Sequence, residues 1–347
     1  MLIGDYKATY AADEAIFRSW PVRYGFVAMV AGLVVLPFAA NSFIVFLATQ
    51  VAIYTVAITG LNILTGYTGL ISLGHGALVG VGAYATAILA NWLGVPFWVV
   101  IPMAVAVTAG VGLMFGLPSL RIRGLYLTIA TLAASFIIVF VIEHWGSVTN
   151  GDSGITLAPA SVFGIDLVSD PQKYALIVPI AVLAVLFAQN LFRTRIGRAF
   201  IAIRDSDYSA EIIGVGLTRY KLLAFGLGSA YAGLAGSLWA YNFLALLPTQ
   251  FELQLSIIFL AALVVGGSAR TLGPVFGAVF VILIPELLKW VFGFLTPFNP
   301  TIVEYTAPAN TIAYGLLIIV FMIFEPMGLA AIWTRIWRYI NLWPFSP

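Results

Sequence analysis

The sequence contains no cysteine and very little charge. Without cysteine, the chain can form neither a disulfide framework nor a thiolate metal site. Its two histidines, His75 and His144, are far apart and stand in no HExxH pattern, which argues against a membrane metalloenzyme. Charged residues make up only 9% of the chain, against about 25% in soluble globular proteins. The net charge of +2 is too small to indicate a nucleic-acid partner.

Apolar residues dominate the composition. They make up 62% of the 347 residues, and the mean hydropathy is +1.04. Exposing so much apolar surface to water would cost roughly 25 cal/mol per Å², so the lipid bilayer is the solvent that fits. Each crossing needs about 20 apolar residues. We predict an all-α integral membrane protein with about ten transmembrane helices, at 24–40, 43–60, 74–92, 97–117, 124–144, 174–192, 222–243, 254–266, 272–293 and 309–324.

Two parts of this pattern depart from simple spans. The stretch 61–73 is apolar but is interrupted by Gly66 and Gly69. We expect it to be a broken or re-entrant segment inside the bundle, because irregular backbone at membrane depth survives only within protein. The eighth segment, 254–266, is short for a full crossing.

The basic residues fix the expected orientation. With ten spans and an N-terminus inside, the inner loops hold all of the 16 basic residues except Lys173 and Lys289. Cytoplasmic loops of membrane proteins carry an excess of Lys and Arg. We therefore expect both termini in the cytoplasm of a bacterium, with the chain in its inner membrane. The inner basic residues are Lys7, Arg18, Arg23, Arg121, Arg123, Arg193, Arg195, Arg198, Arg204, Arg219, Lys221, Arg270, Arg335 and Arg338.

The same arrangement predicts the domain organisation. Residues 1–23 form a cytoplasmic N-terminal extension, residues 24–330 the transmembrane domain, and residues 331–347 a cytoplasmic C-terminal tail. Within the transmembrane domain, an outer loop at 145–172 is rich in Gly, Ser, Asp and Pro, and an inner loop at 193–221 is basic.

The inner loop contains the signals of one short helix. Asp205, Ser206 and Asp207 are residue types that cap helix N-termini, and Gly214 and Gly216 suit a helix end. So short a helix is marginal alone. One interpretation is an ordinary positive loop on lipid headgroups; the other is a knob that docks into a soluble partner. Ile212 and Ile213 on this turn favour the knob.

Glycine and polar residues within the spans suggest a pathway. The stretch GYTGLISLGHGALVGVG at 66–82 is too rich in glycine for close helix packing alone, so we expect a broken helix there. A polar residue at this depth can face a pathway or make a hydrogen bond between helices. The pathway candidates are Asn62, Tyr67, Ser72, His75, Thr128 and Asn242.

Several stretches resemble the LivM/LivH-type permeases of branched-chain amino acid ABC importers. They include LNILTGYTGLISLGHGALVGVGAYATAIL at 61–89, GLYLTIATLAASFIIVF at 124–140, and FEPMGLA at 324–330. The strongest match is IGRAFIAIRDSDYSAEIIGVGLTRYKLLAFGLGSAYAGLAGSL at 196–238. The likeness covers roughly residues 40 to 330, and the long inner loop and N-terminal extension favour the LivM-like member of the pair.

The resemblance implies a fold like that of type II ABC importers and a set of partners. These are a second, LivH-like permease subunit, two ATPase subunits that bind ATP and Mg, a periplasmic substrate-binding protein and the lipid bilayer. The permease itself would be no enzyme, would have no catalytic residue, and would bind no cofactor and no metal. The family's coupling helix falls on 204–216. The residues expected to contact the ATPase are Arg204, Asp205, Asp207, Tyr208, Ala210, Glu211 and Gly214.

The substrate stays open at this stage. The resemblance favours branched-chain amino acids as the substrate, and the same family suggests urea, short amides or aromatic carboxylates as alternatives. An ion-coupled secondary transporter would need carboxylates within the membrane, and only Glu286 is a candidate. A channel would need a selectivity filter, and nothing resembling one is visible in the sequence.

Overall fold

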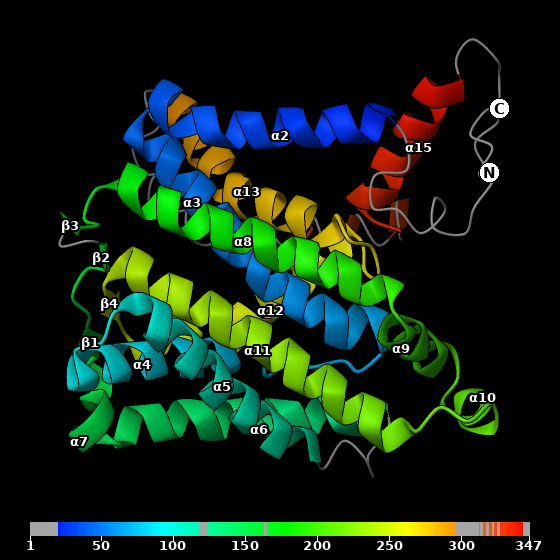
Figure 1. Cartoon of the computed structure of the whole chain (residues 1–347), viewed down its shortest axis with the longest axis horizontal. Helices are drawn as coiled ribbons and strands as arrows, with labels where there is room; N and C mark the ends of the chain where they lie inside the picture. The colour runs from blue at the N-terminus through cyan, green and yellow to red at the C-terminus, as the bar shows by residue number, and fades with distance from the viewer. Residues whose placement is uncertain are drawn as a thin grey trace.

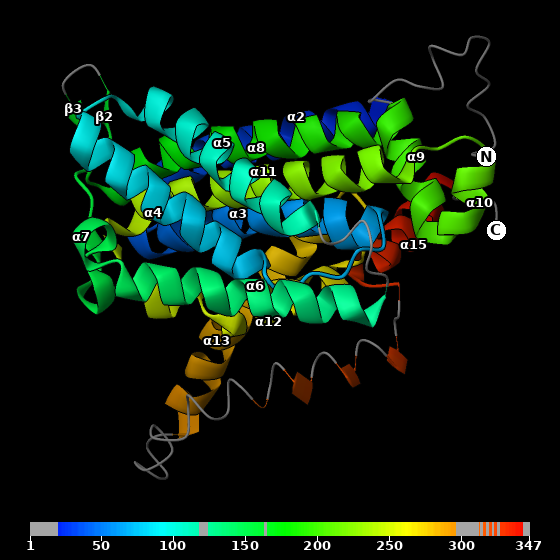
Figure 2. The same ribbon diagram turned by 90° about the horizontal axis from the view of Figure 1, so that it is seen from below.

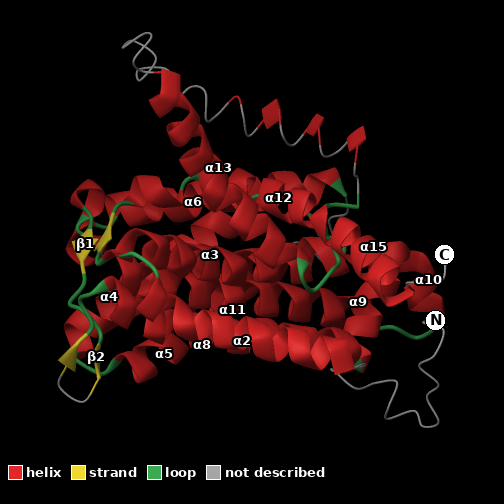
Figure 3. Ribbon diagram, turned by 90° about the horizontal axis from the view of Figure 1, so that it is seen from above, coloured by secondary structure: helices red, strands yellow, loops and turns green. Residues whose placement is uncertain are grey.

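The chain is a bundle of long helices. The computed structural model describes residues 20–117, 124–162, 165–295 and 327–342, together with short helical pieces between 312 and 324. Most helices run side by side along the long axis of the molecule (Figure 1), and this arrangement persists when the molecule is turned (Figure 2). Figure 3 shows that short strands gather at one end of the bundle, opposite α10 and α15.

Eight helices of the described residues are long and apolar enough to cross a membrane. They are Ser42–Tyr67, His75–Leu93, Phe97–Gly116, Tyr126–His144, Asp170–Arg193, Leu217–Phe243, Pro248–Gly266 and Gly273–Trp290. The helical elements that form or flank them are α2 (Trp20–Ala39), α3 (Ser42–Leu61), η1 (Asn62–Tyr67), α4 (His75–Leu93), α5 (Phe97–Gly116), α6 (Leu125–His144), α8 (Asp170–Arg193), α11 (Leu217–Phe243), η4 (Pro248–Phe251), α12 (Leu253–Gly266) and α13 (Gly273–Leu295).

These helices confirm the predicted all-α membrane fold and agree with the second to ninth predicted segments. The first predicted segment, 24–40, overlaps α2, which ends at Ala39; the part Met29–Ala39 is apolar but shorter than a full span. The tenth, 309–324, lies largely outside the described residues, as do the N-terminal residues 1–19 and the basic residues at 121 and 123. The eighth segment is longer than expected, because the single turn of η4 precedes α12 and extends the apolar stretch to Pro248–Gly266.

A break in the helices occurs where the glycines predict it. The backbone of α3 continues into the π-helix η1, ends at Tyr67, and becomes helical again at His75. Gly69 adopts a left-handed conformation (φ +74°) that a side chain would strain. The backbone N–H groups exposed by the break are satisfied by hydroxyls: Leu73 N donates to Thr131 Oγ1 (3.1 Å) and Gly76 N to Ser256 Oγ (2.8 Å). Protein groups thus replace the water that the membrane lacks.

Helix α11 lies at the centre of the packing. It contacts α3, α4 and α5, and its small residues allow the backbones to approach closely. A Cβ on Gly82 of α4 would lie only 2.6 Å from the Cα of Gly233 on α11. Such close approach also accounts for Gly66, Gly74, Gly76 and Gly80, so packing explains more of the glycine-rich stretch than the sequence suggested.

The end that carries the strands is here called the loop end. Its elements follow α6 and precede α8: α7 (Gly146–Thr149), η3 (Gly151–Ser153), β1 (Ile155–Thr156), β2 (Ser161–Val162) and β3 (Ile165–Asp166). Strand β1 pairs antiparallel with β4 (Ala245–Leu246), which follows α11, and β2 pairs with β3. The pairing of β1 with β4 ties the predicted outer loop to the far end of α11.

Candidate functional site

Two short helices form the opposite end of the bundle, here called the α10 end. They are α9 (Arg195–Asp205) and α10 (Asp207–Ile212), which connect α8 to α11 (Figure 1). The side chain of Ser206 caps α10 by accepting a hydrogen bond from Ser209 N (3.2 Å). Gly214, at φ +89°, lets the chain turn away after α10. The capped helix predicted in this loop is therefore present, whereas α9 was not predicted.

A partly buried ion pair anchors α10 to the bundle. The Nζ of Lys221, in the second turn of α11, lies 2.6 Å from the Oδ2 of Asp207, the first residue of α10. The side chain of Lys221 is only 5% exposed and that of Asp207 22%. Ala210 is also buried and packs inward. Because a six-residue helix has little stability alone, these contacts fix its position relative to α11.

The outward side of α10 carries large apolar side chains beside the exposed Glu211. Tyr208, Ile212 and Ile213 are 73%, 69% and 73% exposed. They lie on or directly after the six-residue α10, which is too short to cross a membrane. A cluster of large apolar side chains exposed in this way marks a contact surface for another molecule.

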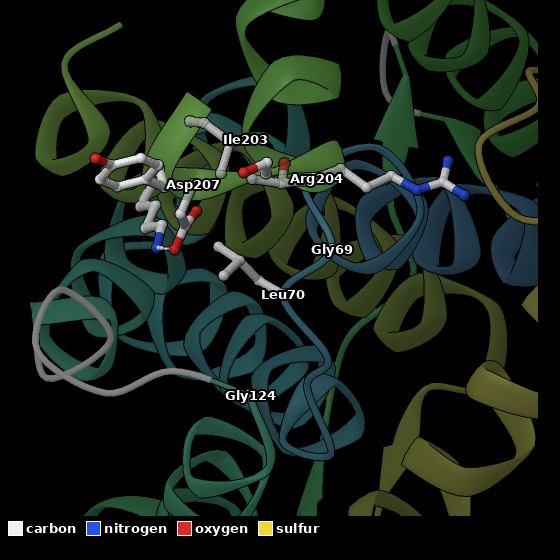
Figure 4. Close-up of a pocket in the computed structure, with 10 residues that line it drawn as sticks. Gly69, Leu70, Gly124, Ile203, Arg204 and Asp207 are labelled. Carbon is white, nitrogen blue, oxygen red and sulfur yellow. Dashed lines mark hydrogen bonds and ion pairs between the residues drawn. The ribbon is translucent and has the colours of Figure 1, made fainter. Parts of the chain in front are cut away.

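A groove of about 400 Å³ lies at the base of α10. The groove is lined both by the two short helices and by the segment that follows η1 (Figure 4). Gly69 packs here against Arg204, and a Cβ at Gly69 would lie 3.4 Å from the Cα of Arg204. The lining residues are Thr68, Gly69, Leu70, Gly124, Ile203, Arg204, Ser206, Asp207, Tyr208 and Lys221. Helices α9 and α10 therefore contact both α11 and the segment between η1 and α4.

The residues expected to contact an ATPase divide into two groups. Five are exposed at the α10 end: Arg204, Asp205, Tyr208, Glu211 and Gly214. The other two hold α10 against the bundle, because Ala210 is buried and Asp207 forms the ion pair with Lys221. From the sequence, Lys221 was predicted only to be one of the inner basic residues. Its place in the second turn of an apolar helix, 14 residues after an aspartate, is the signal that could have identified the pair.

The candidate pathway residues cluster around the break, with one exception. Asn62, Tyr67, Ser72 and His75 lie on η1, on the segment that follows it, or at the start of α4, and all four are buried. Thr128 is near them, because its carbonyl accepts a hydrogen bond from Thr131, which in turn binds Leu73 N. Asn242 lies apart at the far end of α11, where its carbonyl accepts from Lys173 Nζ (2.9 Å).

Most of these side chains have internal partners. Tyr67 stacks on Phe192 with ring centroids 3.5 Å apart. His75 Nε2 lies 2.8 Å from the carbonyl of Ala57. The hydroxyl of Ser72 accepts from Gly74 N at 3.3 Å. His75 Nδ1, Thr128 Oγ1 and Asn242 Nδ2 are buried without a hydrogen-bond partner in the described residues.

Asn62 connects two distant parts of the chain. Its Oδ1 accepts from Ala269 N (2.9 Å) and its Nδ2 donates to the carbonyl of Arg270 (3.0 Å). Both partners belong to the turn between α12 and α13, more than 200 residues away. The amide thus satisfies one donor and one acceptor of a turn that would otherwise lack partners.

We expect Asn62→Leu to destabilise the protein by about 2–4 kcal/mol, since two hydrogen bonds are lost and a buried backbone N–H loses its acceptor. Thermal unfolding in detergent measures the effect. Asn91→Leu is the matched control, because Asn91 is exposed and makes a single hydrogen bond, to the Thr156 carbonyl. Equal melting temperatures for the two variants would show that the contacts of Asn62 do not support the fold.

Known proteins resemble the chain over most of its length. The family described as "Branched-chain amino acid transport system / permease component" matches residues 43–324. The LivM permease protein of the high-affinity branched-chain amino acid transport system of Salmonella typhimurium is 31% identical, over 84% of this chain and 71% of the relative. The Escherichia coli LivM protein is 30% identical, over 87% and 73%.

A more distant relative carries a different name. The fructose import permease protein FruG of Bifidobacterium longum is 26% identical, over 90% of this chain and 85% of its own length. No solved structure matches the chain. Taken with the eight apolar helices, the matches show that the chain belongs to the family of branched-chain amino acid transport permeases, the multi-pass, non-catalytic membrane subunits of ABC transporters.

Proposed function

We propose that this chain is the LivM-like permease subunit of an ABC importer that carries branched-chain amino acids into the cytoplasm. The observation that carries the proposal is the capped and anchored α10 with its exposed apolar side. The names of the LivM relatives support the substrate. The family's other proposed substrates, namely urea, short amides and aromatic carboxylates, are the alternatives, and the FruG relative shows that a similar chain can bear the name of a sugar permease.

The α10 end faces the cytoplasm in this proposal. Of the described basic residues, the following lie there: Arg193, Arg195, Arg198, Arg204, Arg219, Lys221, Arg270 and Arg335. Lys173 instead lies in the first turn of α8, at the loop end. The positive-inside rule supports this orientation, which places the N-terminal extension 1–23 and the tail 331–347 inside.

The resemblance to the family supplies the partners, and the orientation assigns each of them to a face. Two ATPases, which bind ATP and Mg, dock on the inner face, one of them on α10. A LivH-like subunit pairs with this chain in the membrane, and a periplasmic binding protein delivers substrate at the loop end. The contact with the ATPase is made by Tyr208, Ile212 and Ile213 together with the exposed Arg204, Asp205, Glu211 and Gly214.

Coupling then follows from how α10 is attached. Closure of the ATPases displaces α10. The ion pair of Asp207 with Lys221 transmits the displacement to α11, and the contact of Arg204 with Gly69 transmits it to the break before α4. Because α11 packs on α3, α4 and α5, its motion changes the access of the pathway. ATP drives this change to the extent that the ATPases bind the two conformations differently.

An ion-coupled secondary transporter is the second candidate. It would need an ionisable group within the membrane. Glu286 on α13 is already paired with Lys289 one turn away, at 2.7 Å, which favours a local structural role for both residues.

We expect Ile212→Asp to reduce co-purification of the ATPase subunits and ATP-driven uptake by roughly tenfold, because burying a charge in an apolar contact is costly. Val168→Asp is the matched control, since Val168 is similarly exposed but lies at the loop end. ATPases that remain bound to the Ile212→Asp variant would contradict docking on α10. The exposed Ile212 is preferred to Ala210 for this test, because substitution of the buried alanine would also disturb the helix.

A further inference from the structure

The last described helix, α15 (Leu329–Leu342), differs from the spans in length and in pattern. Its 14 residues extend for about 21 Å at 1.5 Å per residue, too short for a hydrocarbon core of about 30 Å. Its sequence, LAAIWTRIWRYINL, has apolar and aromatic residues at helical spacing. By the same spacing, the polar side of the helix includes Thr334 and Arg335, and the helix contains no acidic residue.

The first turn of α15 is fixed to the bundle. Gly328 packs directly on Gly267, in the turn between α12 and α13, where a Cβ on Gly328 would lie 2.5 Å from the Gly267 backbone. Ala330 and Ala331 are buried. On the polar side, Arg270 Nη1 donates to Thr334 Oγ1 (3.2 Å). The orientation of α15 is therefore set by the protein.

That orientation differs from the orientation of the spans. Figure 1 shows α15 at the α10 end, steeply inclined to α2 and α8. Trp333 contacts Phe276, in the first turns of α13, with ring centroids 5.9 Å apart. It nevertheless remains 45% exposed, and Ile336, one turn from Ile332, is 47% exposed. The apolar side of the helix is thus open beside the point where a membrane-spanning helix begins.

We propose that α15 lies in the membrane interface and binds anionic phospholipid headgroups. Trp333 and Ile336 enter the boundary of the acyl chains, and Arg335 and Arg338 attract the lipid phosphates. Three observations favour lipid as the occupant: the helix adjoins the start of α13, its charges are exclusively positive, and it combines tryptophan with arginine as interfacial helices do. The inference does not depend on the substrate or on docking at α10.

The absence of cysteine permits a direct test. A nitroxide is attached to the full chain at Ile336→Cys and, as controls, at Val168→Cys in the loop end and Leu183→Cys on the exposed side of α8. The proteins are reconstituted in vesicles of phosphatidylcholine alone or mixed with phosphatidylglycerol. Collision of the label with oxygen, which enters lipid, is compared with collision with a water-soluble nickel chelate.

We expect the label at 336 to report a depth of about 5–10 Å below the headgroups, between the two controls. Phosphatidylglycerol should shift the equilibrium between buried and water-exposed label toward the buried state, by up to about fivefold in its equilibrium constant for each arginine, and Arg335→Gln with Arg338→Gln should remove that shift. Nickel access equal to that at 168 would overturn the proposal. Protection from both reagents would indicate a protein partner and overturn it as well, and burial unaffected by phosphatidylglycerol would overturn the binding of anionic headgroups.

Discussion

Gly82→Val is expected to prevent α4 and α11 from packing and to leave little correctly folded protein. The reason is that a Cβ at position 82 would lie 2.6 Å from both the Cα and the carbonyl oxygen of Gly233. Both are backbone atoms of a long helix and cannot rotate away. Gly233 itself packs on Thr108 of α5, so moving α11 aside would displace a second contact. We expect a loss of at least about 3 kcal/mol, which exceeds the cost of an ordinary surface change.

Gly110→Val on α5 is the control for this prediction. It makes the same substitution at an exposed glycine in a membrane-spanning helix, where a Cβ would meet no atom within 4 Å. Size-exclusion chromatography in detergent and the melting temperature measure the two effects. Comparable yields of monodisperse protein for both variants would contradict the close contact of α4 with α11.

The second large effect is expected for Asp207→Ala. This change leaves the ammonium group of Lys221 buried without its carboxylate. Removing one member of a buried ion pair typically costs about 3–5 kcal/mol. The short α10 has few other attachments, so we expect it to detach from α11 and ATP-driven uptake to fall by at least about a hundredfold. Uptake into vesicles and co-purification of the ATPases are the measurements.

A double variant separates the interaction energy of the ion pair from the individual contributions of Asp207 and Lys221. Asp207→Ala combined with Lys221→Met removes both charges, so we expect it to recover part of the stability that the single variant loses. Lys289→Met serves as the control, since it breaks an ion pair within one turn of α13 and should change uptake little. Effects of the two substitutions that simply add would contradict an energetic link between Asp207 and Lys221.

Helix positions followed from the sequence wherever apolarity alone decides them. The predicted segments 97–117 and 124–144 differ from α5 and α6 by a single residue at one end. The cap at Ser206 and the turn at Gly214 were equally visible, because they depend on neighbours in sequence. Helix α9 was missed, since its four charged residues read as part of a loop and its apolar side is recognised only when packed against the bundle.

Contacts between distant residues could not be predicted. Asn62 stands out in the sequence as a polar residue in a span, but nothing there shows that it binds the turn at 269–270. The buried position of Ala210 likewise depends on how α10 packs, which explains why it was grouped with the exposed contact residues. The dense glycines correctly indicated a break in the helix. Most of them, however, allow close contacts between helices, and these contacts are visible only in the three-dimensional structure.

The most direct test of the account is uptake of labelled leucine by the complete reconstituted transporter. The complex is placed in vesicles with its binding protein outside and ATP inside, and the wild-type chain is compared with Ile212→Asp. The account predicts accumulation that requires both ATP and the binding protein and that the Ile212→Asp substitution strongly reduces. Accumulation that continues without ATP and follows an imposed proton gradient would contradict it.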